Sequence, residues 1–419
     1  MSISGDTALE LVVDGVIYQM QTTGGISRLF TETLPRMCEL EKALHIIMFT
    51  TGSTPQTLPR HPHINHVYIP QIERYLRPWR FWKPHFPELK QIITKVRTGN
   101  IKKKKIWHST YYTTLDKWEG PSVVTVYDMI HERFPQFFIN PGKVIEQKKR
   151  ALSRADVIIC ISEVTCKDLQ EYYGFVPEGV RIIYPGFSNV FELQRGSLES
   201  AVTPIKYGSE NSGCTQKYSQ RRKPSRGFPK NLQNNEIDSC PTMLFEKPYL
   251  LYVGSRASYK GFDDLLSAYS AWSERDDVIL VVVGEKWSSE EEKKLREHKI
   301  GDGVKLIENV NDVFLRHLYN QAVSLVFPSL YEGLGIPLLE AMACGCPIVA
   351  SRIPTTIEVA RNVPIYFEPG KAEDLLVALD HILSEGRDSL RSRIGLEYVK
   401  QYSWVKAARQ TLEVYRSLT

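Results

Sequence analysis

The sequence predicts an α/β protein of two halves, each with a parallel sheet covered by helices on both faces. Short apolar strands alternate with helices throughout both halves, and residues 121–126 and 278–283 illustrate these strands. Strands that are apolar on both faces are typical of parallel sheets, because helices bury both faces. Residues 193–246, between the halves, are rich in Ser, Asn, Gln, Lys and Arg, and such a composition buries too little surface to form a core.

Length and composition are those of an ordinary globular protein with two or three domains. The chain has 419 residues, 42% hydrophobic and 24% charged, and its formal net charge of +5 is too small to indicate nucleic-acid binding by itself. No apolar run is long enough to cross a bilayer, and residues 1–10 lack the features of a signal peptide. Seven scattered cysteines argue against a disulfide framework, so a reducing, cytoplasmic location is expected. Cys344 and Cys346 lack a second ligand pair and are expected to be small buried residues.

The first half is expected to contain seven strands, at residues 9–14, 44–50, 67–70, 106–108, 121–126, 156–161 and 181–184. Gly24 and Gly25 lie between the first strand and a helix that ends near Leu40, where they let the backbone pass close to a ligand. A plain turn is the alternative. Arg28, one helical turn later, adds positive charge to such a site or is a surface arginine. Further helices are expected at residues 141–154 and after Ser162, which is a suitable N-cap.

Aromatic and cationic side chains are interleaved in residues 73–90. This pattern suits an anionic, partly apolar surface, such as a membrane that carries a lipid-linked acceptor. Stacking of an acceptor sugar on an indole and a loop that covers the core are the alternatives. The basic run at residues 102–105 is expected to be a solvated loop, with membrane contact as the second choice.

Polar groups follow directly after the apolar strand at residues 121–126. Asp128 and His131 therefore lie where open α/β sheets bind ligands, at the carboxyl end of a buried strand. A structural histidine is the alternative for His131.

The second half repeats the alternation, with strands expected at residues 249–253, 278–283, 304–307, 323–327 and 347–350. Arg256 and Lys260 share one loop at a strand's carboxyl end, where two cations can neutralise a diphosphate; two exposed cations are the alternative. Helices are expected up to residue 272, at residues 338–343 and 372–383, and from Ser403 onward. Glu358 is expected to cap or orient a short helix.

Glu332 and Glu340 flank a glycine-rich turn between the strand that ends at Phe327 and a short helix. Pro337 suits the first helical position, because its φ is fixed and it needs no hydrogen-bond acceptor there. The amides of residues 333–336 and the positive helix end predict an anion site. Carboxylates repel phosphate, so the two glutamates are expected to bind sugar hydroxyls. The alternative for Glu340 is an acid that merely stabilises the helix N-terminus.

The sequence Glu332-Gly-Leu-Gly-Ile-Pro-Leu-Leu-Glu340, with the Pro-Ser before it and the Ala-Met-Ala after it, resembles the E-x7-E motif of family 4 retaining glycosyltransferases. The resemblance implies the GT-B fold, in which two Rossmann-like domains with parallel sheets face a central cleft. Residues 1–190 would form the acceptor-binding domain and residues 247–402 the nucleotide-sugar-binding domain. Residues 191–246 would be a flexible, basic insertion at the linker, or an arm for a membrane or partner. Residues 403–419 would form a helix that crosses back to the first domain.

The resemblance also implies roles for individual residues. Arg256 and Lys260 would grip the donor diphosphate in place of a metal ion, Glu340 would hold the ribose diol, and Glu332 would act on the donor sugar. Asp128 and His131 are the catalytic candidates of the first domain, where Tyr127 stands in place of the histidine common in relatives. The other expected donor contacts are Gly24, Gly25, Gly333, Leu334, Gly335 and the main chain at Val310.

The chain most resembles bacterial mannosyltransferases of surface polysaccharide and lipopolysaccharide synthesis. The implied reaction transfers a hexose with retention, from GDP-mannose as first choice or a UDP-sugar as second, to a glycan or lipid-linked acceptor. No cofactor, metal or nucleic acid is expected. Peripheral contact with the inner face of an anionic membrane is expected. Three alternatives stay open: a sugar-nucleotide epimerase, a phosphorylase with pyridoxal phosphate, and a silent binding protein.

Overall fold

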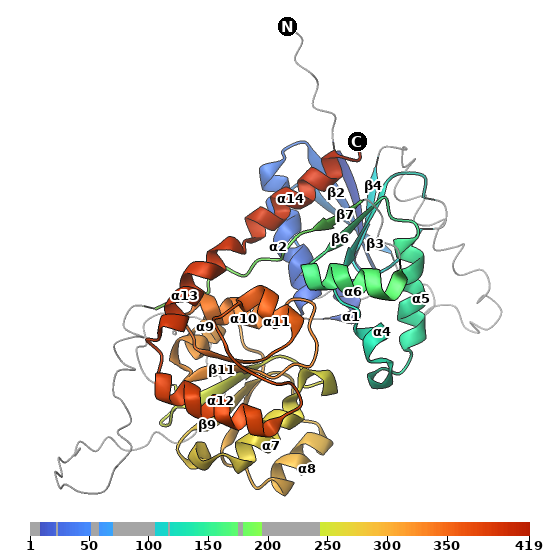
Figure 1. Cartoon of the computed structure of the whole chain (residues 1–419). Coiled ribbons are helices and arrows are strands. Elements are labelled where there is room, and N and C mark those ends of the chain that lie inside the picture. The colour runs from blue at the N-terminus through green and yellow to red at the C-terminus, as the bar shows by residue number, and fades with distance from the viewer. Residues whose placement is uncertain are drawn as a thin grey trace, which may run out of the picture.

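The protein, described here from a computed structural model, has two lobes that are each built around a parallel sheet (Figure 1). The structure describes residues 9–21, 24–51, 58–69, 105–115, 118–174, 179–194 and 244–419. The expectations for residues 73–90, for residues 102–104 and for most of the polar stretch 193–246 lie outside the described residues.

The amino-terminal lobe contains a seven-stranded sheet in the order β3-β2-β1-β4-β5-β6-β7, with parallel pairing between all of these neighbours. Its strands are β1 (Leu9–Asp14), β2 (Leu44–Thr51), β3 (Ile64–Ile69), β4 (Ile106–Ser109), β5 (Ser122–Val126), β6 (Val157–Cys160) and β7 (Val180–Ile182). Its helices are α1 (Ile17–Met20), α2 (Gly25–Leu40), α4 (Ile130–Arg133), α5 (Pro141–Leu152) and α6 (Glu163–Tyr173). The predicted strands are thus all present, with small shifts at their ends.

The carboxyl-terminal lobe contains a six-stranded sheet in the order β10-β9-β8-β11-β12-β13, again with parallel pairing between neighbours. Its strands are β8 (Tyr249–Val253), β9 (Ile279–Val283), β10 (Val304–Ile307), β11 (Ser324–Phe327), β12 (Ile348–Ser351) and β13 (Ile365–Phe367). Its helices are α7 (Phe262–Ala271), α8 (Ser289–Glu297), α9 (Asp312–Gln321), α10 (Ile336–Ala343), α11 (Pro354–Ala360), α12 (Ala372–Glu385) and α13 (Leu390–Tyr398).

Local sequence signals fix several helix ends. The Ser162 hydroxyl accepts a hydrogen bond from the amide of Thr165, as an N-cap does, and α6 ends at Gly174 in the left-handed conformation. Pro337 lies in the first turn of α10, after Gly335 at a φ of 90°. The predicted strand–turn–helix unit around Glu332 is therefore confirmed.

The strand order reverses direction at one point in each sheet, between β1 and β4 and between β8 and β11. Open α/β sheets bind ligands outside the carboxyl ends of the strands at such points. The loop after β8 carries Lys260, and the loop after β11 carries Glu332. The topology thus brings these two predicted residues to the same edge of the sheet.

The last helix, α14 (Trp404–Arg416), returns to the amino-terminal lobe and lies along α2, as the red helix at the top of Figure 1 shows. Its Tyr415 is buried and makes a hydrogen bond with Nδ1 of the buried His108 on β4. Two segments of the chain pass close together at the start of this helix. A Cβ on Gly186 would lie 2.2 Å from the amide nitrogen of Trp404.

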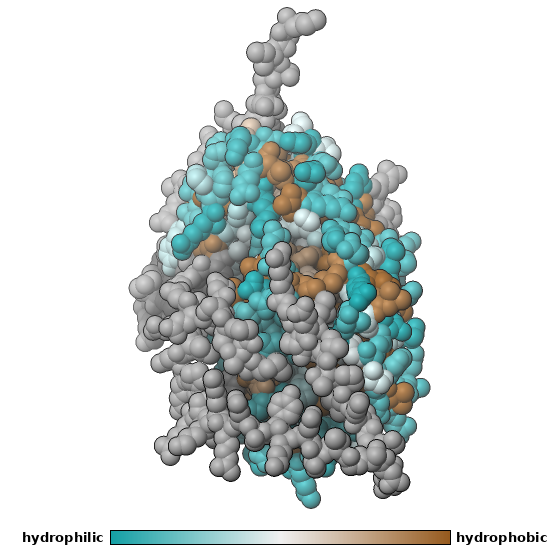
Figure 2. Space-filling view, turned by 90° about the vertical axis from the view of Figure 1, so that its left-hand side faces the viewer, coloured by the Kyte–Doolittle hydropathy of each residue, from teal (hydrophilic) through white to brown (hydrophobic). Residues whose placement is uncertain are grey.

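No helix in the described ranges combines the length and apolar character needed to span a bilayer. The face of the molecule in Figure 2 is mostly hydrophilic where it is coloured, with apolar residues in small separate groups.

Candidate functional site

A cavity of about 660 Å³ lies between the lobes, beside the points where both strand orders reverse. Most of the site residues that the sequence predicted line this cavity. The predicted residues in its lining are Gly24, Gly25, Asp128, Lys260, Val310, Glu332, Gly333, Leu334, Gly335 and Glu340. Of the predicted set, His131 and Arg256 are not among the described residues that line it.

Lys260 and Glu332 form an ion pair in this cavity. The Lys260 Nζ donates to both carboxylate oxygens of Glu332, at 2.8 and 2.9 Å, and the Ser329 hydroxyl donates to one of them at 2.7 Å. Burial alone lowers the pKa of Lys260, but the charge of Glu332 and the neighbouring Tyr259 and Asp128 outweigh it, so the pKa lies above its ordinary value. Lys260 is therefore a fixed positive charge within the cleft.

The turn that contains Gly333 presses against the opposite lobe. A Cβ at Gly333 would lie 1.9 Å from the carbonyl oxygen of Tyr127, so only glycine fits there. The hydroxyl of Ser162, at the start of α6, donates to the Gly333 carbonyl at 2.8 Å. The glycine in the E-x7-E motif thus permits direct backbone contact between the lobes.

Glu340 is almost fully buried, with 4% of its side chain exposed, in the first turns of α10. The Tyr319 hydroxyl donates to its Oε2 at 3.1 Å, and Arg28 Nη1 donates to its Oε1 at 3.2 Å. Burial raises the pKa of Glu340 to about 7; Arg28 opposes this rise, Asp312 adds to it, and the Tyr319 hydrogen bond lowers the pKa. This carboxyl group therefore titrates near neutral pH.

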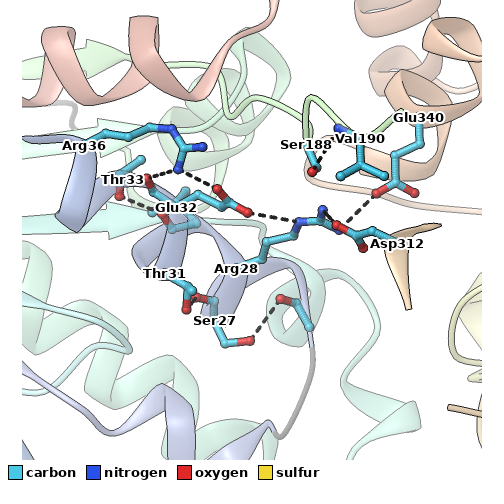
Figure 3. Close-up of polar contacts among 12 residues, drawn as sticks. Ser27, Arg28, Thr31, Glu32, Thr33, Arg36, Ser188, Val190, Asp312 and Glu340 are labelled. Carbon is cyan, nitrogen blue, oxygen red and sulfur yellow. Dashed lines mark hydrogen bonds and ion pairs between the residues drawn. The ribbon is translucent and has the colours of Figure 1, made fainter. Parts of the chain in front are cut away.

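Arg28 lines the cavity and connects the two lobes (Figure 3). It extends from the first turn of α2 in the amino-terminal lobe to two acids of the other lobe, Glu340 on α10 and Asp312 at the start of α9. Its Nη2 donates to Asp312 Oδ2 at 2.5 Å, and its Nε lies 4.0 Å from Glu32 on its own helix. The sequence placed Arg28 near the glycine loop but gave no sign of these partners.

Asp128 and His131 differ in position. Asp128 lines the cavity, and its Oδ1 accepts a hydrogen bond from the amide of Ile130 at 3.1 Å. His131 packs its ring against Phe138, with 4.3 Å between ring centroids, and burial lowers its pKa. Of the two first-domain candidates, the geometry brings Asp128 to the cavity.

Arg256 lies on the same loop as Lys260 but has a different partner. Its guanidinium donates to Glu291 on α8, with Nε to Oε1 at 2.5 Å, and to the Lys286 carbonyl at 3.1 Å. It also stacks over the Trp287 ring, with 4.5 Å from Cζ to the ring centroid. With these partners, Arg256 is not among the described residues that line the cavity.

The cavity thus combines two cations, Arg28 and Lys260, a glycine turn at a helix N-terminus and four carboxylates, those of Asp128, Asp312, Glu332 and Glu340. The Lys260 ammonium and the helix end favour an anion such as a diphosphate, and the carboxylates accept hydrogen bonds from hydroxyl groups. Asp312 and Tyr319 were missed by the sequence analysis. The only signal was their position in the helix after Val310, which does not show where their side chains point. Within the described ranges, no group of three or more His, Cys, Asp and Glu side chains is placed to hold a metal ion.

Two family models match the chain. The model for glycosyl transferases group 1 matches residues 243–401, and the model for glycosyltransferase family 4 matches residues 23–188. The two matches correspond to the two lobes.

Curated relatives include two O-antigen mannosyltransferases. The chain is 32% identical over 178 residues to O-antigen chain mannosyltransferase B of Escherichia coli, which covers 41% of this chain and 46% of the relative. It is 30% identical over 134 residues to O-antigen chain mannosyltransferase RfbU of Salmonella typhimurium, and this match covers 32% of this chain and 38% of the relative. The chain therefore spans less than half the length of these relatives.

Solved structures share the two-lobed fold over almost the whole chain. The sucrose-phosphate synthase of Thermosynechococcus elongatus superposes with a TM-score of 0.70 at 18% identity, covering 98% of this chain and 99% of that one. WaaG, a glycosyltransferase of lipopolysaccharide biosynthesis, gives 0.66 at 17% identity, covering 98% and 100%. Anabaena HepE in complex with UDP-glucose gives 0.67 at 13% identity, covering 98% and 100%.

Proposed function

Since this chain belongs to the family 4, group 1 glycosyltransferases, we propose that it transfers a hexose, with retention and without a metal ion, from a nucleotide-diphosphate sugar to a glycan or lipid-linked acceptor. The observation that carries the proposal is the cleft between the lobes, in which Lys260, Glu332 and Glu340 lie around one glycine turn. Anabaena HepE, which shares the fold, was solved with UDP-glucose, and this supports a nucleotide sugar as the ligand.

The donor would lie across the cavity with its diphosphate near Lys260. The lysine and the amides of residues 333–336 would stabilise the charge that develops on the leaving diphosphate. Arg256 is proposed as a second cation, recruited from its pair with Glu291 when the donor binds. Glu340 would accept from both ribose hydroxyls, with the base near the main chain of Val310.

The reaction exchanges one bond at the anomeric carbon for another. The bond from this carbon to the diphosphate oxygen breaks, and the acceptor oxygen forms a new bond on the same face. The acceptor proton passes to a donor phosphate oxygen, so the products are a glycoside and a nucleoside diphosphate. Glu332 would contact the donor sugar and stabilise positive charge at the anomeric carbon, and Gly24 and Gly25 would border the acceptor. Asp128, rather than His131, is the preferred amino-terminal participant because it lines the cavity.

GDP-mannose is proposed as the donor, and a UDP-sugar is the second candidate. The similarity to two O-antigen mannosyltransferases supports mannose and a role in surface polysaccharide synthesis. Because the chain spans less than half of those relatives, the donor is best tested directly.

A lipid-linked acceptor would place the enzyme at the cytoplasmic face of a membrane. The segment between α4 and α5 has the chemistry for this contact, since Ile139 is 98% exposed and Phe137 is 40% exposed. Lys143 and Lys149 on α5 are exposed nearby and complement an anionic lipid surface. The protein should therefore sediment with vesicles that contain phosphatidylglycerol, and not with vesicles of phosphatidylcholine alone.

The decisive experiment measures nucleoside diphosphate release from GDP-mannose, UDP-glucose and UDP-galactose, with a glycan acceptor, and repeats the assay with EDTA. Release that requires the acceptor and persists in EDTA is expected, and the product should keep the donor's anomeric configuration by NMR. Interconversion of the sugars without diphosphate release would instead indicate an epimerase.

Glu332→Gln is the variant that tests the proposed role of Glu332, because it keeps the shape of the side chain and removes its charge. We expect at least a hundredfold loss of kcat, since the loss of one group that stabilises transition-state charge typically costs about this much. Glu397→Gln, at an exposed position paired with Lys400, is the control and should keep full activity. Normal turnover by Glu332→Gln would contradict the proposed role.

A further inference from the structure

The Glu340 carboxylate lines the cavity and has unused acceptor capacity. A carboxylate offers about four lone-pair positions, and here Tyr319 takes one on Oε2 and Arg28 takes one on Oε1. Two positions are then left, which is the number that a ribose diol needs. Arg28 therefore need not leave when the nucleotide binds.

We propose that Arg28 is a positioning residue of the donor site supplied by the opposite lobe: it holds Glu340 as a charged, oriented carboxylate that can accept from both ribose hydroxyls. This inference rests on the proposed function. Three contacts fix the guanidinium: Asp312 at 2.5 Å, Glu340 at 3.2 Å and the Phe191 ring below it, with 5.8 Å from Cζ to the ring centroid. Figure 3 shows it between Glu32 on one side and the two acids on the other.

The charged and titratable groups that face Glu340, among the described residues, come from three elements. Arg28 projects from α2, Asp312 and Tyr319 project from α9, and Cys344 ends the helix of Glu340 itself. Arg28 is the one cation among them, so its loss leaves a buried carboxyl beside a second acid. The neutral form of Glu340 would then be favoured, and a neutral carboxyl accepts fewer hydrogen bonds.

The consequence is a pH dependence of donor binding with a defined sign. Because the pKa of Glu340 is about 7, donor KM should rise as the pH falls below 7. One opposite charge usually lowers a carboxyl pKa by about 1 or more. In Arg28→Gln the rise in KM should therefore start at a higher pH, with KM about fivefold above wild type at pH 7 and close to wild type at pH 9. The kcat at saturating donor should change less than KM.

The test measures the dissociation constants of GDP and UDP by calorimetry from pH 6 to pH 9, alongside donor KM and kcat. Arg28→Gln should move the midpoint of the affinity profile upward, and Arg28→Lys should restore part of the shift. Asp312→Asn removes the neighbouring acid and should move the midpoint the other way. Arg36→Gln is the matched control, because Arg36 lies two turns later on α2 and pairs with Glu32 of the same helix.

Opposite shifts in the two variants, with the control unchanged, would support the proposal even if Arg28→Gln also lowers Tm. A midpoint that stays at the wild-type pH in both variants would overturn it while the donor site stands. If wild-type protein binds neither GDP nor UDP at any pH, both this inference and the proposed function are wrong.

Discussion

At the scale of single residues, Lys260 balances the negative charge of Glu332 in the cleft. Its partner Glu332 outweighs the effect of burial, so the pKa of Lys260 is raised and the ammonium group stays charged at neutral pH. In the structure the lysine neutralises Glu332. In the proposed donor complex the same cation would lie between this carboxylate and the diphosphate.

Lys260→Met is the residue-scale prediction. The change removes the cation but keeps most of the apolar stem, so we expect kcat/KM for the donor to fall at least a hundredfold. Steady-state diphosphate release measures this, with Lys294→Met as the control, because Lys294 pairs with Asp263 at the surface. A fall of less than threefold would show that the lysine is not needed for the leaving group.

Sequence reasoning succeeded at this scale where residues share one local turn. The Glu332–Glu340 unit has a fixed spacing, so its glycine turn and helix could be recognised from the sequence. Arg28 and Glu340 are 312 positions apart, and no local pattern indicates that they meet. The direction of Arg256 was equally hidden, because its partner Glu291 lies 35 positions away in the sequence and is brought close by tertiary packing.

At the scale of elements, the other lobe adds a second capping group to α6 beside its own N-cap Ser162. The carboxylate of Glu358 on α11 accepts hydrogen bonds from the amides of Glu163 and Val164, at 2.7 and 2.8 Å, and from the Tyr184 hydroxyl at 2.7 Å. A carboxylate at this end also interacts favourably with the helix dipole. The sequence predicted that Glu358 caps or orients a short helix. In the structure Glu358 caps the 11-residue helix α6 of the opposite lobe.

Glu358→Ala should destabilise the junction between the lobes. Loss of an N-cap usually costs about 0.5–2 kcal/mol, so thermal denaturation should show a lower Tm. Glu368→Ala is a suitable control, since Glu368 is on the same lobe and pairs with Arg352 in an exposed position. Equal Tm values for both variants would mean that the cap contributes no net stability.

The strands, like the Glu332–Glu340 turn, were predictable because their sequence signal is local. An apolar run between turn residues identifies a buried strand locally, and parallel pairing follows from the helices between the strands. The ends were less certain, as β7 shows by ending two residues before the predicted boundary at Tyr184. Strand ends depend on hydrogen bonds to neighbouring strands, which the sequence of one strand does not specify.

For the whole molecule, the contact at Gly333 determines how closely the lobes approach. Tyr331 strengthens it, because its hydroxyl accepts from the Met129 amide at 2.8 Å and donates to Asp168 at 2.6 Å. These contacts and the Ser162–Gly333 hydrogen bond lie beside the cavity. The separation of the lobes and the shape of the cavity are therefore coupled.

Gly333→Ala should force the lobes apart. The added Cβ would overlap the Tyr127 carbonyl oxygen, and overpacking of this kind costs about 1–3 kcal/mol. We expect a lower Tm, a larger radius of gyration by small-angle X-ray scattering and a higher donor KM. Gly301→Ala is the control, because a Cβ there meets nothing within 4 Å. An unchanged radius of gyration and KM would show that the turn adapts without moving the lobes.

The return of α14 to the first lobe has a consequence for synthesis. Phe30 and Met37 on α2 lie against the face that Ala407 and Tyr415 of α14 cover. A ribosome makes α14 only after the entire second lobe, although domains usually fold as units in the order of their translation. The apolar face of α2 in the nascent first lobe must therefore stay uncovered until α14 has been made. A chaperone that binds apolar helix faces could bind there during this interval.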